Sequence, residues 1–271
     1  MPLHFSTNVT VPFIVGSPLS FAFTTRAIAR YGLGRPGWRD DLQQALAIAR
    51  SADPWSYVTV VGYIYNVGIP TGVLRPDDSA MREIEDALRI AQRSADDLAL
   101  TAARMTLGLA LVHRHTVAER DRGQKLLVEV RDMRLRTRFS LGDLPFVEIY
   151  LAREQARCGD RDDAIPRLRA AVDHALRELL LGWGVLATGV LVETLLDRGA
   201  DGDVAEAEAA IKRLARLSAV AWSDAWLLRL RALLARAHGD AAAYADLRDR
   251  YRDMARTLGF EGHIDWAEAM P

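Results

Sequence analysis

"LQQALAIAR" (residues 42–50) and "IEDALRIAQ" (residues 84–92) decide the fold, because both stretches carry the same pattern of small and apolar residues. The shared pattern consists of Leu42, Ala45, Leu46 and Ala49 in the first stretch and of Ile84, Ala87, Leu88 and Ala91 in the second. The spacing i, i+3, i+4, i+7 places such residues on one face of an α-helix. Both stretches run into "SAD", so two similar helices are expected about 42 residues apart.

The same stripe returns four more times, in "RGQKLLVEV", "DDAIPRLRAAV", "DVAEAEAAIKRL" and the segment 244–254. The spacing of these amphipathic segments is measured between one marker residue in each of the first five: Ala45, Ala87, Gln124, Ala164 and Ala207. The steps between these markers are 42, 37, 40 and 43 residues. A period near 40 residues is typical of helical repeat proteins.

More apolar segments alternate with these amphipathic ones. They cover approximately residues 18–31, 55–68, 97–113, 143–158, 183–198 and 221–238. This alternation predicts an all-α protein, an α-solenoid of about six antiparallel helix hairpins. We divide the chain into an N-terminal extended segment (1–17), a repeat domain (18–258) and a C-terminal capping segment (259–271).

The unit at 148–171 fits a divergent tetratricopeptide pattern. Leu151 and Ala152 occupy the Leu-Gly positions, Gly159 ends the first helix, and Ala164 lies where the second helix packs closely. The Trp and Tyr positions of that pattern hold Glu148 and Gln155. We therefore expect the repeats to be tetratricopeptide-like.

Composition limits the function classes. The net charge of −1 provides no overall field toward nucleic acid or an anionic membrane. The only cysteine, Cys158, excludes an intrachain disulfide and is typical of a reducing, cytoplasmic location. Charged residues interrupt every apolar run before it reaches membrane-spanning length. We predict a cytoplasmic chain with no direct nucleic-acid or membrane partner.

"GLGRPG" (residues 32–37) has the letters of a dinucleotide-binding fingerprint. That motif requires a preceding strand within a βαβ unit, whereas helical patterns flank it here. We predict an inter-helix turn, with Gly32 or Gly34 in the left-handed conformation. Asp203 and Glu206, after a similar turn, are expected to form a capping box.

No residues form a recognisable catalytic or metal-binding motif. His113 and His115 are two apart, so on a helix they point in different directions. Cys158 is interpreted as a packed thiol, and "RDMRLRTR" (residues 131–138) as a solvated helix end. We assign no catalytic, metal-binding or cofactor-binding residues and expect no cofactor.

The C-terminal "LGFEGHIDWAEAMP" supplies apolar groups next to two glycines. The last hairpin of a solenoid has a face that terminal segments usually cover. We predict that this tail folds back onto the preceding hairpin, with Trp266 or Phe260 as its main buried anchor.

Three stretches resemble a known family: "VGSPLSFAFTTRAIARYGLGRPGWRDDLQQALAIARSADP", "TGVLVETLLDRGADGDVAEAEAAIKRLA" and "RDRYRDMARTLGFEGHIDWAEAMP". They look like the C-terminal tetratricopeptide-like region of actinobacterial multidomain signalling proteins, which join a class III adenylate cyclase to an AAA (STAND-type) ATPase. Related architectures carry a LuxR-type DNA-binding domain or a kinase domain instead. The shared words are structural, so no catalytic residue is carried over.

The resemblance implies a non-catalytic interaction or sensor module that regulates upstream adenylate cyclase and ATPase domains. The expected partner is a protein or peptide, or the upstream catalytic domains of the same polypeptide. Phe146, Ile149 and Arg153 are predicted to face it from the concave surface. The alternatives are a stand-alone oligomerisation scaffold, with a possible homodimer, and the repeat region of a LuxR-type transcriptional regulator.

Overall fold

The protein is all-helical over the residues that the structure, a computed structural model, describes: 17–94, 96–138, 141–178, 180–216 and 220–271. Within these ranges it has 13 α-helices, a short 3-10 helix (Leu141–Asp143) and no strand. The first helices of the hairpins are α1 (Pro18–Gly32), α3 (Pro54–Gly68), α5 (Asp97–Leu111), α7 (Leu144–Arg157), α9 (Leu181–Arg198) and α11 (Ala221–Ala237). The second helices are α2 (Trp38–Ala52), α4 (Asp78–Arg93), α6 (Val117–Thr137), α8 (Arg161–Arg177), α10 (Asp203–Ala215) and α12 (Ala241–Leu258). With α13 (Glu261–Glu268) following the sixth hairpin, the predicted helical solenoid is confirmed.

Capping residues and glycines set the helix boundaries. The side chains of Ser17 and Asp53 accept backbone N–H groups in the first turns of α1 and α3, each just before a proline. Proline suits this position because the first turn of a helix needs no backbone donor. Gly259 ends α12 with φ +66°. The predicted repeat domain, 18–258, thus begins with α1 and ends with α12, while residues 1–16 of the predicted extended segment lie outside the described residues.

The "GLGRPG" stretch is a turn between α1 and α2, as predicted. Gly34 and Gly37 have φ of +65° and +84°, and Gly37 directly precedes α2. Of the two glycines proposed for the left-handed position, Gly34 is right, since Gly32 is the last residue of α1.

The predicted capping box of α10 is wrong. Gly202 is the residue before the helix, and Asp203 is its first helical residue. Asp203 accepts hydrogen bonds from Arg198 and from the N–H of Ala200, while Glu206 pairs with Arg169. Pairing with arginines of neighbouring segments therefore replaces the expected local cap.

Small buried residues mark the positions where helices pack most closely. Ala45, Ala87, Ala164 and Ala207 are all buried, as the stripe predicts. The third marker, Gln124, is wrong by one residue, because Gly123 holds the buried position. A Cβ atom at Gly123 would lie 2.9 Å from the carbonyl oxygen of Gly108 on α5. The crossing of α5 and α6 therefore requires glycine at position 123, a position that the stripe in "RGQKLLVEV" includes.

The repeat period is visible in the ion pairs between neighbouring hairpins. Arg198 pairs with Asp162, 36 residues away, at 2.7 Å. Arg169 pairs with Glu206, 37 residues away, at 2.6 Å. Each pair joins one hairpin to the next, because residues one repeat apart become neighbours when repeats stack.

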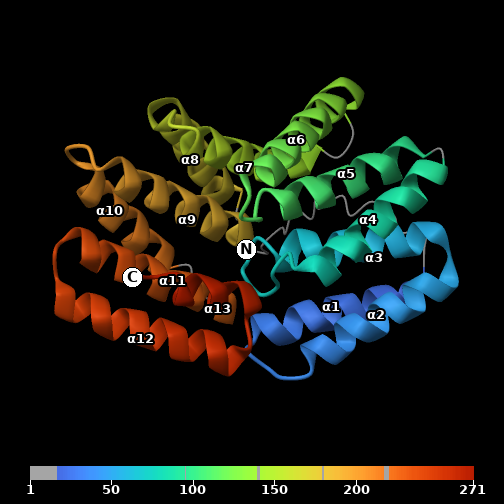
Figure 1. The fold of residues 1–271 in the computed structure, drawn as a ribbon, viewed down its shortest axis with the longest axis horizontal. Coiled ribbons are helices and arrows are strands. Elements are labelled where there is room, and N and C mark those ends of the chain that lie inside the picture. The colour runs from blue at the N-terminus through green and yellow to red at the C-terminus, as the bar shows by residue number, and fades with distance from the viewer. Residues whose placement is uncertain (1–16, 95, 139–140, 179, 217–219) are drawn as a thin grey trace, which may run out of the picture.

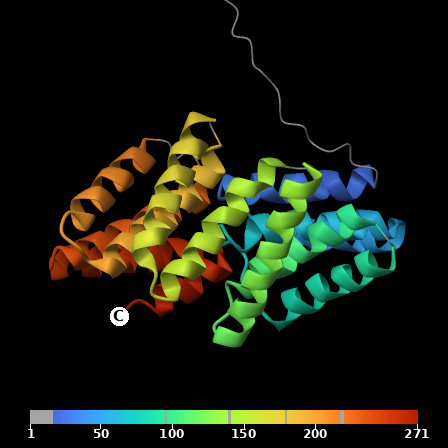
Figure 2. The same cartoon turned by 90° about the horizontal axis from the view of Figure 1, so that it is seen from above.

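The two ends of the solenoid meet, so the hairpins form a closed ring (Figure 1). In this view the red α12 and α13 lie beside the blue α1 and α2. Arg39 of α2 donates to the Gly259 carbonyl oxygen at 2.5 Å and pairs with Glu261 at 3.1 Å. Seen from above (Figure 2), the blue-to-green and yellow-to-red halves lie side by side as two groups of helices.

The C-terminal tail (residues 259–271) holds the two ends of the ring together. Phe260 is 0% exposed and contacts Trp38 of α2, so the predicted burial of an aromatic anchor is confirmed for Phe260, whereas Trp266 is partly buried. The N–H groups of Glu261 and His263 donate to the carbonyl oxygens of Val73 and Gly72, both at 3.0 Å. The tail therefore packs against the loop after α3 as well as against the last hairpin.

At this junction the loop after α3 and the C-terminal tail approach each other so closely that only glycine fits at two positions. Gly72 has φ +76°, and a Cβ atom there would lie 2.7 Å from the Trp266 ring and 2.9 Å from the His263 ring. A Cβ atom on Gly262 would lie 3.0 Å from the Gly72 carbonyl oxygen.

Gly72→Ala is expected to lower the free energy of unfolding by about 3 kcal/mol. The cost of a positive φ for alanine and the cost of overpacking by the added methyl group add together. Gly239→Ala is the matched control, because Gly239 has φ +74° and open space around it. The control is expected to cost about 1 kcal/mol. Denaturant unfolding of both variants checks this, and equal losses would contradict the close approach at the ring junction.

Candidate functional site

A cavity of about 540 Å³ opens between α7, α9 and α11 near their carboxyl ends. Cavities of this size hold small molecules in many proteins. Its charged lining residues are Arg153, Arg157, Glu193, Asp197, Arg229 and Arg236. Because these six come from three successive first helices, the stacking of the repeats itself creates the site.

The repeat pattern places charged residues in equivalent positions around this cavity. Arg153, Glu193 and Arg229 follow one another at steps of 40 and 36 residues, close to one repeat. His113 precedes Arg153 by 40 residues and contacts it directly. Arg153 and Glu193 hold the same position relative to the turn glycines Gly159 and Gly199, whereas Arg229 lies one helical turn before the equivalent position relative to Gly239.

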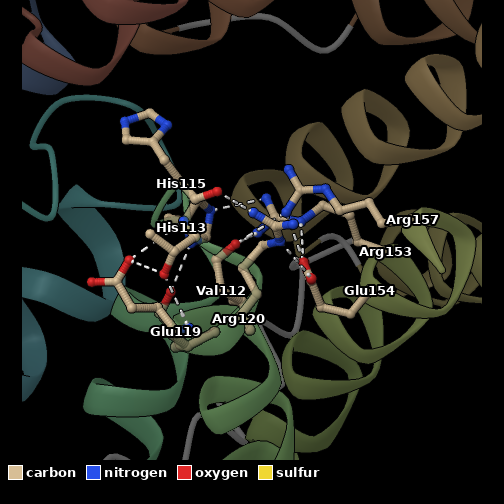
Figure 3. A network of polar contacts seen from close by, with 10 residues as sticks. Val112, His113, His115, Glu119, Arg120, Arg153, Glu154 and Arg157 are labelled. Carbon is tan, nitrogen blue, oxygen red and sulfur yellow. Dashed lines mark hydrogen bonds and ion pairs between the residues drawn. The ribbon is translucent and has the colours of Figure 1, made fainter.

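Arg153 connects α7 to the end of α5 (Figure 3). Its Nη2 donates to the Val112 carbonyl oxygen at 2.8 Å, and its Nη1 lies 3.0 Å from Nε2 of His113. The guanidinium carbon lies 4.6 Å from the centre of the Tyr150 ring, and the side chain is 12% exposed. Arg157 also donates to the Val112 carbonyl oxygen, at 3.1 Å. Val112 ends α5, so both arginines satisfy a carbonyl group that the helix leaves open.

One buried carboxylate serves three guanidinium groups. Glu154, whose side chain is 4% exposed, accepts a hydrogen bond from Arg157 at 2.7 Å. Its carboxylate oxygens also lie 3.5 Å from Nε of Arg153 and 3.7 Å from Nε of Arg120. Figure 3 shows these side chains converging from α7 and from the beginning of α6. The cluster therefore has more positive than negative charge.

His113 adds no charge to the cluster. Burial, and then the neighbouring Arg153, hold the pKa of its imidazole well below the ordinary value. The neutral ring fits its contacts, with Nδ1–H donating to the Leu109 carbonyl oxygen at 2.7 Å and Nε2 accepting from Arg153. Burial, followed by the charge of Arg157, lowers the pKa of Arg153 to about 9, so this guanidinium stays protonated at neutral pH.

Arg229 lies on the opposite side of the cavity and is held by aromatic rings. Its guanidinium carbon is 5.6 Å from the Trp226 ring and 5.3 Å from the Trp266 ring of the tail. It pairs with Glu193 of α9. Burial lowers the pKa of Arg229 as well. The ring closure by α13 therefore brings Trp266 against Arg229, which lines this wall of the cavity.

The three residues predicted to face a partner have different environments. Phe146 and Ile149 are 4% and 1% exposed, and Phe146 stacks on Trp183. Arg153 lines the cavity. A ligand entering the cavity would therefore meet Arg153 and not the other two. Sequence reasoning missed Arg157, Arg229 and Arg236; for Arg157, the charged residue Asp197 one repeat later was a usable signal.

The remaining sequence candidates stay apart from the cavity. Cys158 is exposed, although the sequence suggested a packed thiol. Arg134 is buried and pairs with Asp143 at 2.9 Å, so the "RDMRLRTR" stretch is not wholly solvated. Among the described residues no group of three or more His, Cys, Asp or Glu side chains is arranged to hold a metal ion. None of the helices in the described ranges is both long and apolar enough to cross a membrane.

No protein-family model, curated protein or solved structure matches this chain. The resemblance to the repeat regions of cyclase and ATPase signalling proteins therefore stays a prediction. The site has to be interpreted from its own geometry.

Arg153→Met is expected to leave the free energy of unfolding within about 1 kcal/mol of the parent or to raise it, because a buried charge that shares its carboxylate, Glu154, with two other arginines is costly. Val112 keeps the hydrogen bond from Arg157. Arg198→Met is the control, since Arg198 neutralises the buried Asp203 with two hydrogen bonds, at 2.6 and 2.9 Å. The control should lower the unfolding midpoint clearly. A larger loss for Arg153→Met than for Arg198→Met would assign Arg153 a purely structural role.

Proposed function

We propose that this chain is a non-catalytic binding module that regulates adenylate cyclase and ATPase domains, and that the cavity between α7, α9 and α11 is its binding site. The observation that carries the proposal is the set of four arginines that α7 and α11 place around one cavity, together with two carboxylates from α9. Ring-shaped helical repeats suit such a role because small shifts between repeats transmit binding at one repeat to its neighbours. The resemblance of the sequence to regulatory repeat regions supports the choice of target domains.

The carboxylates at the cavity favour binding over acid–base catalysis. Asp197 accepts hydrogen bonds from Arg161 at 2.8 and 2.5 Å, and Glu193 pairs with Arg229. A general base needs a carboxylate that is free to accept a proton from the substrate. Both carboxylates are occupied by arginines, which suits a site that holds a ligand.

The test is to titrate the purified chain into cyclase and ATPase regions encoded in the same or a neighbouring reading frame. We expect the chain alone to produce no cyclic AMP and to hydrolyse no ATP, and to change either rate when it is added to those regions. Light scattering on the same samples measures whether the chain dimerises, as the scaffold alternative requires. Cyclic AMP production or ATP hydrolysis by the chain alone would overturn the proposal. So would a constitutive dimer that leaves both rates unchanged.

A further inference from the structure

The cavity and its immediate partners carry an excess of positive charge. The arginines that line it or pair with its carboxylates are Arg120, Arg153, Arg157, Arg161, Arg229 and Arg236. The carboxylates are Glu154, Glu193 and Asp197. Six guanidinium groups therefore stand against three carboxylates, and the neutral His113 does not alter this balance.

Two of these arginines also keep buried donors without an acceptor. The Nε atoms of Arg153 and Arg229 are buried and have no hydrogen-bond partner among the described residues. The nearest carboxylate oxygen to Nε of Arg153 is 3.5 Å away, on Glu154. A buried N–H group without an acceptor is costly, and more so when it belongs to a charged group. Such a donor calls for an acceptor from outside the chain, such as a water molecule, an ion or a ligand.

We infer that this cavity binds a small oxyanion carrying at least two negative charges, held by the guanidinium groups of Arg153, Arg157 and Arg229. The inference rests on the proposed function in one respect, that the cavity is the binding site of the module. Phosphate and carboxylate groups share the required chemistry, since planar guanidinium groups bind the oxygens of either in pairs. The negative charge of the ligand offsets the excess positive charge of the cavity wall.

The arrangement of the arginines supports a small molecule as the occupant. Arg153 and Arg157 are one helical turn apart on α7, and Figure 3 shows their guanidinium groups side by side at the end of α5. Arg229 approaches from α11, beside two tryptophan rings that contact each other. A volume of about 540 Å³ accommodates one compact ligand between these two walls.

The experiment is isothermal titration calorimetry of the full chain with two probes, inorganic pyrophosphate and succinate, without added metal. We expect at least one probe to bind with a Kd below about 1 mM at low salt. Affinity should decrease as NaCl is raised. Binding of pyrophosphate alone identifies a phosphorylated ligand, binding of succinate alone a dicarboxylate, and either result supports the assignment.

Variants separate the cavity from general attraction of anions. Arg153→Met and Arg229→Met should each weaken binding at least tenfold, while Arg213→Met, which removes an exposed arginine paired with Asp173, should not change it. Circular dichroism and thermal unfolding confirm that each variant is folded, and Arg153→Lys, which keeps the charge and loses the planar group, should be intermediate. Absence of heat with both probes, or equal binding by all variants, overturns the oxyanion assignment. Neither result affects regulation of the cyclase and ATPase domains, which is measured separately.

Discussion

Deleting residues 260–271 is expected to lower the free energy of unfolding by about 4–6 kcal/mol, because a fully buried phenylalanine alone contributes about 3–5 kcal/mol. The deletion removes Phe260, which is 0% exposed, together with the ring contacts of His263 and Trp266. It also removes the hydrogen bonds from the tail to the loop after α3. Denaturant unfolding followed by circular dichroism measures the loss.

Two further variants make this prediction specific to ring closure. Phe260→Ala in the full chain should reproduce most of the loss. Glu268→Ala should leave the midpoint unchanged, because Glu268 is exposed and its ion pair with Arg256 spans 3.6 Å at the surface. An unchanged midpoint after the deletion would show that α13 does not hold the ring together.

Stability is expected to fall by about 1.4 kcal/mol per pH unit as the pH drops below about 6.5, because of His263. Burial, and then the charge of Arg229, lower the pKa of this imidazole to about 3, while the Thr71 backbone opposes the shift. The folded chain therefore keeps His263 neutral where the unfolded chain binds a proton. Its contribution is complete above the unfolded pKa and is lost as the pH falls toward the folded one.

A comparison with His263→Gln isolates this residue from other titrating groups. His113 also has a lowered pKa, but it is present in both proteins and cancels in the difference. Between pH 6.5 and 4.5 the parent should lose about 2.3 kcal/mol more than the variant. Denaturant unfolding at both pH values measures the two losses. Parallel pH profiles for parent and variant would contradict the buried, neutral imidazole, which accepts a hydrogen bond from Tyr251 at 2.8 Å.

Local patterns predicted the helices, their pairing and the turns. The stripes that contain Ala45 and Ala87 each lie within a few turns of a single helix. Gly34 is flanked by helical sequence on both sides. Such features depend on neighbours in the sequence, so they can be recognised without any tertiary contact. The stripe in "RGQKLLVEV" included Gly123, and only the spacing marker, Gln124, was wrong by one residue; the contact of Gly123 with Gly108 cannot be recognised from the helical stripe.

Ring closure and the cavity were not predicted, because they depend on distant segments. Arg39 and Gly259 are 220 residues apart, and no periodic pattern connects them. The cavity arginines are scattered among 35 basic residues, most of them on solvated helix faces. Arg153 and Arg157 share their repeat positions with Glu193 and Asp197, whereas Arg229 lies one helical turn before the equivalent position, so the sequence pattern does not connect it with them.

Helix α13 closes the ring and so places Trp266 against Arg229 at the cavity. Hydrogen exchange of the Glu261 and His263 amides tests it most directly, because N–H groups in the first turn of a helix have no intrahelical acceptor. In the closed ring these two amides donate to Val73 and Gly72, and we expect them to exchange at least ~100-fold more slowly than the exposed Ala242 at the first turn of α12. Exchange of Glu261 and His263 as fast as that of Ala242 would mean that the ring is open, and would contradict the account.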